Sequence, residues 1–458
     1  MSIEVKNLFK YYGDQAAVKD ISFKVNSGEV VGFLGPNGAG KSTTMKVITG
    51  YISASQGEVK VCGKNVSVDS LDTRQVIGYL PEHNPLYLDM YVKEYLTFVG
   101  KIYKVPNLKD RVQEMIKKVG LEVEQNKKIG ALSKGYRQRV GLAQAIIHDP
   151  EVLILDEPTA VLTPQETDEL LQVMKNLKKQ GTSIIFITHK LREVKEAADR
   201  ITIIRRGKVV GTALPSATQE ELASQMVGRP VDLTMNKNPA KIGSDLLSIS
   251  NLVVTDSAGR ELLHNVSLDV RAGEIVAVAG VQGNGQTELA RAILNLEEHV
   301  SGSILVDGKN IVGETVRGSL HSGVAFIPES RELDGLIGSF SIAENLILDT
   351  YDLAPNAKGL LMSPSTIKSQ AEKRIAEFDI RSQGASELVS SLSGGNKQKV
   401  VLARELSRPV KVVVASQPTR GLDVGSIEFV HEKIVQERDA GRAVLLFSTE
   451  LDEVFALA

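Results

Sequence analysis

Short apolar runs recur along the chain, each bounded by charged or turn-forming residues. They include VVGFL from Val30, VLIL from Val152, SIIFIT from Ser183 and AVLLFS from Ala443. Continuous runs of this length predict strands of a parallel sheet that is covered on both faces. Helix-rich segments separate the runs, so the pattern predicts an α/β fold.

This pattern occurs twice. One repeated segment is SGEVVGFLGPNGAGKSTTMKVITG, from Ser27, which returns as AGEIVAVAGVQGNGQTELARAIL from Ala272. Another is LSKGYRQRVGLAQAI, from Leu132, which returns as LSGGNKQKVVLAREL from Leu392. The offset between the copies is 245 residues at the first segment and 260 at the second, so the later copy holds about 15 extra residues between them.

Each copy of the 458-residue chain is long enough to bury a core of its own. We expect a first domain over 1–241, linker included, and a second over 242–458. Residues 214–245 combine a short helical pattern with Pro, Gly, Asn and Lys, which is typical of an exposed linker. The first copy ends in ADRITIIRRGKVVGTA, from Ala198, which predicts a strand hairpin. The second copy stops before this hairpin, at Ala458, so we expect a fragment rather than an unusually short second copy.

Composition excludes several function classes. Lys and Arg number 54 against 56 Asp and Glu, so no overall charge favours nucleic acid or an anionic membrane surface. Cys62 is the only cysteine, which excludes an intramolecular disulfide and a cysteine-based metal site and favours a reducing compartment. No uninterrupted apolar stretch approaches the roughly 18 residues that span a bilayer, so any membrane crossing is expected from a partner.

The segment GPNGAGKS matches the phosphate-loop pattern G-x-x-x-x-G-K-[ST], with a strand before it and a helix after it. Backbone N–H groups of such a loop wrap the phosphates, and the helix N-terminus adds positive potential. Lys41 is expected to reach the β- and γ-phosphates, and Ser42 to hold Mg²⁺. The residues expected to contact ATP here are Gly35, Pro36, Asn37, Gly38, Ala39, Gly40, Lys41, Ser42 and Thr43.

Two carboxylates follow the later strand VLIL. Asp156, at the strand's carboxyl end, can reach the metal, and Glu157 can polarise an attacking water. Ser133 is a suitable N-cap for the helix between the motifs. His189 in FITHKL has many structural uses when it is considered alone. The phosphate loop, the capped helix, the two carboxylates and His189 nevertheless occur in this order, and the order is largely repeated in the second copy. Together they indicate nucleotide hydrolysis.

Together these motifs resemble the ATP-binding cassette family over nearly the whole chain. The resemblance implies two tandem cassettes, each a RecA-like, mainly parallel sheet with antiparallel β and helical subdomains. It also implies that Glu157 is the general base, that His189 contacts the γ-phosphate, and that Tyr12, or failing it Tyr11, stacks on adenine.

Glu82 departs from the family, which usually has a glutamine in this loop. A carboxylate can accept a hydrogen bond from water or approach Mg²⁺, but it cannot donate as an amide does. Altered coupling to a membrane partner is one interpretation, and a solvated acidic turn is the alternative.

The second copy departs further. Gln286 replaces Lys41, Ser416 and Gln417 replace Asp156 and Glu157, Thr449 replaces His189, and Ser257 stands opposite Tyr12. We therefore expect this copy not to hydrolyse ATP, although Gly283 and Gly285 can still support weak nucleotide binding.

In the family, each nucleotide lies between the phosphate loop of one cassette and the LSGGQ-type signature of the other. The second copy keeps LSGG, whereas Lys134 interrupts the signature of the first. The resemblance thus implies one competent composite site, in which Ser393 and the amides of Gly394 and Gly395 close on the γ-phosphate.

Further phrases resemble one branch of the family. The GLDVG run after PTR, and MVGRP near Val227, resemble the ATP-binding subunits of bacterial importers for simple sugars and nucleosides, and ASQPTRGLDVGSIEFV favours nucleosides. Residues 77–96 instead resemble single-cassette ATPases of gliding-motility and multidrug-export type, so an export-type ATPase is an alternative.

The importer resemblance implies two membrane-spanning permease subunits, an extracellular substrate-binding protein and no nucleic acid. It places the chain peripherally on the cytoplasmic face of the inner membrane, with membrane contact only through partners. A soluble tandem-cassette factor of translation-factor type is another hypothesis, but such factors usually have two competent sites and a long charged helical linker. An inactive nucleotide switch is opposed by Lys41, Asp156, Glu157 and His189.

Overall fold

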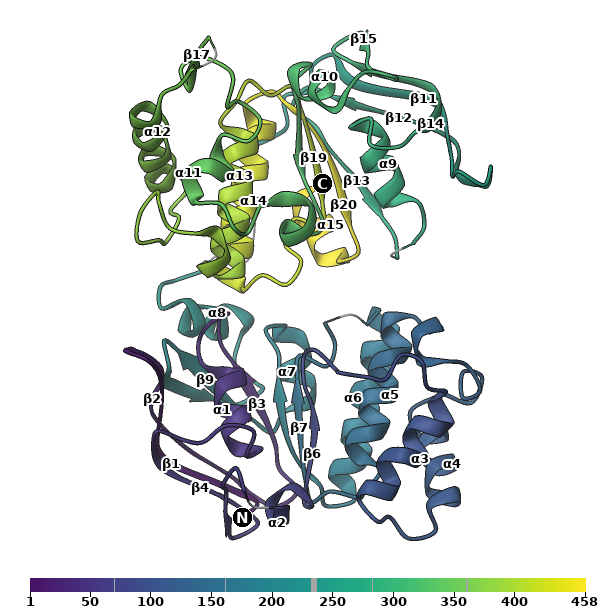
Figure 1. Ribbon diagram of the computed structural model, residues 1–458, viewed down its shortest axis with the longest axis vertical. Coiled ribbons are helices and arrows are strands. Elements are labelled where there is room, and N and C mark those ends of the chain that lie inside the picture. Colours follow the sequence, from purple (N-terminus) through teal and green to yellow (C-terminus); the bar gives the residue numbers. More distant parts are fainter. Residues whose placement is uncertain (70, 161, 232–236, 282, 360) are drawn as a thin grey trace. The chain divides into compact units, whose positions relative to one another are not determined.

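The computed structural model describes residues 1–69, 71–160, 162–231, 237–281, 283–359 and 361–458 (Figure 1). The chain divides into two compact units. The first unit comprises Met1–Val231 with Asp423–Gly425, and the second comprises Asp232–Leu422 with Ser426–Ala458. Among the described residues, no helix combines the length and the apolar character that a membrane crossing requires.

The first unit is built on a six-stranded sheet in which five strands are parallel. Its order is β10 (Lys208–Ala213), β9 (Arg200–Arg205), β3 (Val30–Leu34), β8 (Ser183–Ile187), β7 (Val152–Asp156) and β6 (Ile77–Leu80). Every residue of β3, β7 and β8 is buried, as the continuous apolar runs predicted. Strands β9 and β10 pair antiparallel, which confirms the expected hairpin.

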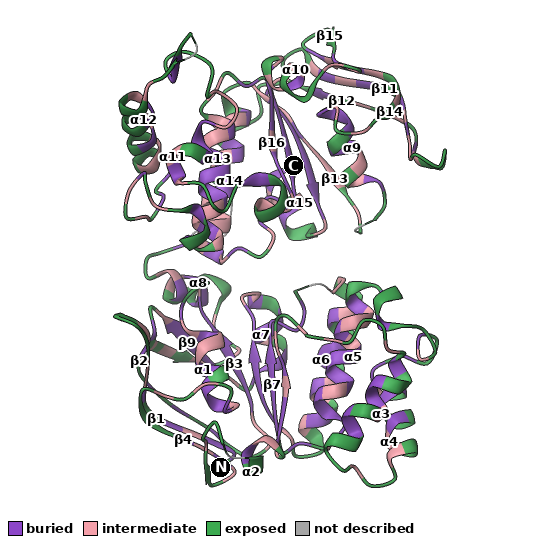
Figure 2. Ribbon diagram, viewed as in Figure 1, coloured by how far each residue is buried: buried purple, intermediate pink, exposed green. Residues whose placement is uncertain are grey.

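Alternate residues of each central strand enter two different cores. Leu153 and Leu155 of β7 pack with four helices, whereas Val152 and Ile154 pack with α1 (Lys41–Ile48) and an antiparallel sheet. The four helices are α3 (Val92–Ile102), α4 (Leu108–Lys118), α5 (Lys134–Ile146) and α6 (Pro164–Lys179). The antiparallel sheet has the order β2 (Gln15–Val25), β1 (Ile3–Tyr12), β4 (Gln56–Val61) and β5 (Lys64–Asn65), and the short helix α2 spans Leu71–Arg74. Figure 2 shows the central strands buried between these layers.

The expected exposed linker is wrong in its first part. Helix α8 (Gln219–Val227) packs on β9 and buries Leu222, Ala223 and Met226. Thr218 and Glu221 form a capping box at its start, and Gly228 ends it in the left-handed conformation. The short helical pattern was therefore real, and its apolar face belongs to the first unit. Residues 232–236 of the predicted linker lie outside the described residues.

The second unit repeats this design. Its parallel sheet has the order β13 (Ile275–Ala279), β20 (Ala443–Ser448), β19 (Val412–Ser416) and β16 (Val324–Ile327). Its antiparallel sheet has the order β12 (Glu261–Arg271), β11 (Asp245–Thr255), β14 (His299–Val306) and β15 (Lys309–Asn310). The helices are α9 (Gln286–Ile293), α10 (Val316–His321), α11 (Ile342–Leu346), α12 (Pro364–Glu377), α13 (Gly394–Leu406), α14 (Val424–Asp439) and α15 (Leu451–Leu457). The α/β fold predicted for both copies is thus confirmed.

Much of the extra length of the second copy lies between α11 and α12. There the chain forms a small hairpin of β17 (Ala357–Lys358) and β18 (Leu361–Met362), whereas α3 and α4 of the first unit are separated by only 103–107. The insertion therefore lies between two helices, outside the strands that carry the motifs.

Candidate functional site

The phosphate-loop segment lies between β3 and α1 in the first unit. A side chain at Gly35 would collide with the carbonyl oxygen of Ile204, and one at Gly40 would lie 2.6 Å from that of Ala17. Gly40 also has a φ of +99°, which favours glycine. The tight turn that aims the amides of α1 into the loop thus depends on glycine at these two positions.

Lys41 is 7% exposed and folds over this loop. Its Nζ donates to the carbonyl oxygen of Gly35 at 2.6 Å and to that of Pro36 at 3.2 Å. Burial lowers the pKa of Lys41, and the charges of Glu157 and Asp156 oppose this shift. The loop therefore holds a buried cation donor that an incoming phosphate can recruit.

Ser42 and Asp156 bring two oxygen donors together. Ser42 Oγ donates to Asp156 Oδ1 at 3.3 Å. Burial raises the pKa of Asp156 to about 6; the bond from Ser42 opposes this shift, and the charges of Glu157 and Glu82 add to it. Hard oxygen ligands beside further carboxylates fit Mg²⁺. No cluster of three His, Cys, Asp or Glu side chains suited to a metal occurs among the described residues, so phosphate and water would supply the other ligands.

Glu157 and His189 follow the neighbouring parallel strands β7 and β8, and their side chains meet. His189 Nδ1 lies 2.9 Å from Glu157 Oε2, and the Glu157 amide donates to the Ile187 carbonyl oxygen at 3.0 Å. Glu157 has a φ of +49°, which few non-glycine residues adopt. This turn directs the carboxylate toward His189 instead of along the strand.

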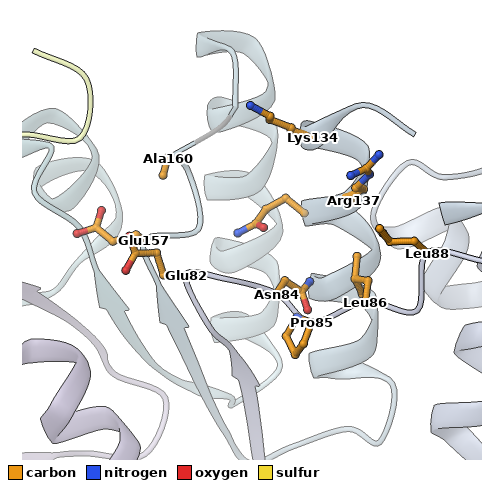
Figure 3. A pocket seen from close by; sticks show the side chains of 10 residues that line it. Glu82, Asn84, Pro85, Leu86, Leu88, Lys134, Arg137, Glu157 and Ala160 are labelled. Carbon is orange, nitrogen blue, oxygen red and sulfur yellow. The ribbon is translucent and has the colours of Figure 1, made fainter. Parts of the chain in front are cut away.

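Glu157 also lines a cavity of about 330 Å³ (Figure 3). Figure 3 shows Glu82 and Glu157 next to each other on one side of it, and Lys134 and Arg137 on the opposite side. The other lining residues are Asn84, Pro85, Leu86, Leu88, Gln138 and Ala160. The cavity thus places the loop of Glu82 next to Glu157, so an approach of the Glu82 carboxylate to the attacking water or to Mg²⁺ is geometrically feasible.

Tyr12 ends β1 and is 52% exposed, with Lys10 Nζ 5.4 Å from the centre of its ring. The ring of Tyr11 instead stacks on that of Phe9, with 6.2 Å between the ring centres. Tyr12 therefore has the freer ring face, which favours it over Tyr11 for stacking on adenine. Its role in binding stays a prediction.

The second unit repeats this geometry without the charged groups. Gln417 has the same φ of +49° as Glu157, and its Oε1 accepts from Thr449 Oγ1 at 3.1 Å. Gln286 Nε2 donates to the Val278 carbonyl oxygen at 3.5 Å. An amide and a hydroxyl thus replace the carboxylate and the imidazole within the same backbone frame.

Both signature segments begin a helix in the same way. Ser133 Oγ caps α5 by accepting from the Tyr136 amide at 3.2 Å, as predicted, and Ser393 Oγ accepts from the Asn396 amide at 3.5 Å. Gly394 and Gly395 lie in the first turn of α13. A side chain at Gly394 would lie 2.8 Å from Arg331 Nη2, so the Arg331 guanidinium would have to move to make room for one.

Sequence reasoning missed two sets of residues near the site. Arg137 and Gln138 line the cavity, and Glu193 contacts Thr159 and Thr188 beside the candidate carboxylate and imidazole. The motif LSKGYRQ contains the first two residues and gave a signal that could have been used. Glu193 gave none by itself, because an acidic residue in a helical segment usually faces solvent.

Comparisons with known proteins show the family of this chain. The family model described as ABC transporter matches residues 18–160 and 263–420. The nucleoside import ATP-binding protein NupA of Lactococcus lactis subsp. cremoris is 43% identical over 460 residues, which is 99% of this chain and 91% of that protein. The guanosine import ATP-binding protein NupO of Bacillus subtilis is 41% identical over 100% of this chain and 91% of that protein. The ribose import ATP-binding protein RbsA of Oceanobacillus iheyensis is 32% identical over 100% of this chain and 93% of that protein.

Proposed function

The chain belongs to the ABC transporter family, and from this premise we propose that it hydrolyses ATP to energise the import of nucleosides. It is an import ATPase for nucleosides or sugars, and the higher identity to the nucleoside and guanosine importers favours nucleosides over ribose. The observation that carries the ATPase proposal is the convergence of Lys41, Asp156, Glu157 and His189 at the carboxyl ends of the first unit's strands.

Each of these residues has a task in the proposed reaction. Lys41 and the loop amides bind the phosphates of ATP, and Ser42 with Asp156 would hold Mg²⁺. Bound Mg²⁺ offsets the charge of the phosphates. Glu157 accepts the hydrogen bond of the attacking water and takes its proton as the bond from the water oxygen to the γ-phosphorus forms. The bond from the γ-phosphorus to the β–γ bridging oxygen breaks in the same displacement, so that ADP leaves and inorganic phosphate is released. His189 orients the Glu157 carboxylate through Nδ1.

The second unit contributes its signature to this proposal, on the sequence pattern and the family resemblance alone. If Ser393 with Gly394 and Gly395 closes the ATP site, Ser393→Arg should lower ATPase activity by about 10²-fold, the typical effect of losing an oxyanion donor. Ser133→Arg is the matched control, because Ser133 caps its helix in the same way. Steady-state phosphate release measures both. Equal losses in the two variants would contradict the pairing of the first loop with the second signature.

Exposed aromatic and aliphatic side chains follow the Glu82 loop, and we name them the α3 patch: Tyr87, Leu88, Tyr91, Phe98 and Ile102. The ring centre of Tyr87 lies 6.0 Å from those of Tyr95 and Phe98, so the patch presents clustered rings. Clustered exposed apolar groups favour a protein partner. We assign the α3 patch to the permease subunits, and the peripheral location of the chain on the cytoplasmic face follows from that contact.

The complex reconstituted with its permease in proteoliposomes should take up labelled nucleosides when ATP is added on the side of this subunit. The variant Tyr87→Asp/Phe98→Asp should lose most uptake and keep the basal ATPase of the isolated subunit, because it changes the patch and leaves the phosphate loop intact. Val123→Asp is the control, since Val123 is 83% exposed outside the patch. Uptake of ribose but not nucleosides would overturn the substrate assignment, and ATP-driven efflux would favour the export-type alternative.

A further inference from the structure

One buried carboxylate outside the proposed reaction contacts both loops that carry Glu157 and His189. Glu193 of α7 (Leu191–Ala197) is 3% exposed. Its Oε2 accepts from Thr159 Oγ1 at 2.6 Å and from Thr188 Oγ1 at 3.1 Å. Thr159 and Thr188 are fully or almost fully buried, so solvent does not supply alternative partners for their hydroxyl groups.

These two threonines lie close in sequence to the reacting pair. Thr159 is two residues after Glu157, and Thr188 immediately precedes His189. The Glu157–His189 contact therefore closes a ring of interactions whose opposite side is the Glu193 carboxylate. We propose that Glu193 is a positioning residue that fixes the distance and orientation of Glu157 relative to His189. This inference rests on the proposed function of that pair.

Helix α7 gives Glu193 a rigid base. Val194 is fully buried against β3, where a side chain at Gly32 would collide with it. The Lys190 amide donates to Thr188 Oγ1 at 3.0 Å, so the hydroxyl that donates to Glu193 also accepts from the start of the helix. The helix that carries the carboxylate is thus fixed against the central sheet. The hydrogen bonds of the carboxylate hold both loops in place relative to that sheet.

The second unit keeps the same arrangement around a different pair. Glu453, 260 residues after Glu193, accepts from Thr419 Oγ1 at Oε1 and from Ser448 Oγ at Oε2, each at 2.7 Å, whereas both threonines of the first unit donate to Glu193 Oε2. His431 Nε2 lies 3.1 Å from the same carboxylate. The loops held there carry Gln417 and Thr449. We call this bridging of two loops by a buried glutamate the acidic brace. It persists in the second unit, where the reacting groups are absent, so Glu453 provides an internal control for a purely structural role of Glu193.

The decisive comparison uses Glu193→Leu, Glu193→Gln and Glu453→Leu. Glu193→Leu removes the acceptor, and kcat for ATP hydrolysis should fall by about 10- to 100-fold, the effect of a small misplacement of reacting groups, while the KM for ATP stays unchanged. Glu193→Gln keeps an oxygen that can accept from both threonines, so it should retain most of the kcat. Glu453→Leu breaks the matching brace and should leave kcat near that of the wild type.

A second pair of variants covers the case in which Glu193→Leu does not fold. Thr188→Val removes one hydroxyl at nearly constant volume and should lower kcat, whereas Thr188→Ser keeps the hydroxyl, as Ser448 does in the second unit, and should not. Amide hydrogen exchange gives a readout without turnover: Glu193→Leu, or Thr188→Val in its place, should speed exchange in residues 157–160 and 187–190 together.

Two results would overturn the positioning role. One is an equal fall of kcat in Glu193→Leu and Glu453→Leu, which indicates general stabilisation of the fold. The other is wild-type kcat and unchanged exchange in Glu193→Leu. Failure of the proposed function looks different, because the wild-type protein would then lack ATPase activity while the exchange experiment still tests the brace.

Discussion

Glu157→Gln is expected to lower kcat for ATP hydrolysis by about 10²–10⁴-fold, the range that general-base catalysis supplies. The amide keeps the size of the side chain and can still contact His189, but it cannot take a proton from water. ATP binding should persist, because Lys41 and the loop amides are unchanged. Phosphate release under saturating ATP measures the first effect, and equilibrium binding of a fluorescent ATP analogue measures the second.

The matched control for this prediction is Gln417→Glu. Gln417 shares the left-handed backbone of Glu157 and sits in an equivalent brace. Restoring the carboxylate there should not raise turnover, since Gln286 and Ser416 still lack the charge and the metal ligand of the first unit. Turnover that survives in Glu157→Gln would refute the assignment of the base, and a gain in Gln417→Glu would refute the inactivity of the second unit.

The strand pattern predicted that the motif residues lie close together, for a simple geometric reason. Parallel strands end at the same edge of a sheet, so residues directly after them must meet. Asp156 is the last residue of β7 and Glu157 follows it, His189 lies just after β8, and the phosphate loop follows β3, which adjoins β8. The positions of the motifs directly after predicted parallel strands therefore predict that the motifs lie close together in space.

Contacts made by side chains of the connecting helices were not predictable in the same way. Glu193 reaches Thr159 across 34 residues of sequence, and only the seat of α7 on Gly32 brings the two together. Helix α8 was mistaken for linker because Pro, Gly and Asn follow it. Its Leu222, Ala223 and Met226 recur at helical spacing, however, and this signal could have shown a buried face.

Lys41→Ala is expected to abolish measurable ATPase activity and to weaken ATP binding by about 10²-fold, which corresponds to roughly 3 kcal/mol for the loss of charge-assisted bonds to phosphate. The ammonium group is buried in the loop and donates to the carbonyl oxygens of Gly35 and Pro36. Among the described residues it forms no ion pair, so it can turn to a phosphate without breaking one. Its removal should leave the fold stable, which thermal unfolding of the variant checks.

The second unit provides the reverse experiment. Gln286 occupies the place of Lys41 at the start of α9, so Gln286→Lys should strengthen nucleotide binding in that unit. It should not restore hydrolysis in the Lys41→Ala background, because Ser416 and Gln417 supply neither the metal-binding carboxylate nor the base. Turnover in Lys41→Ala alone, or its recovery in the double variant, would show that the second unit hydrolyses ATP. If the first unit holds the single competent site, the activity that Lys41→Ala removes cannot be restored by a substitution in the second phosphate loop.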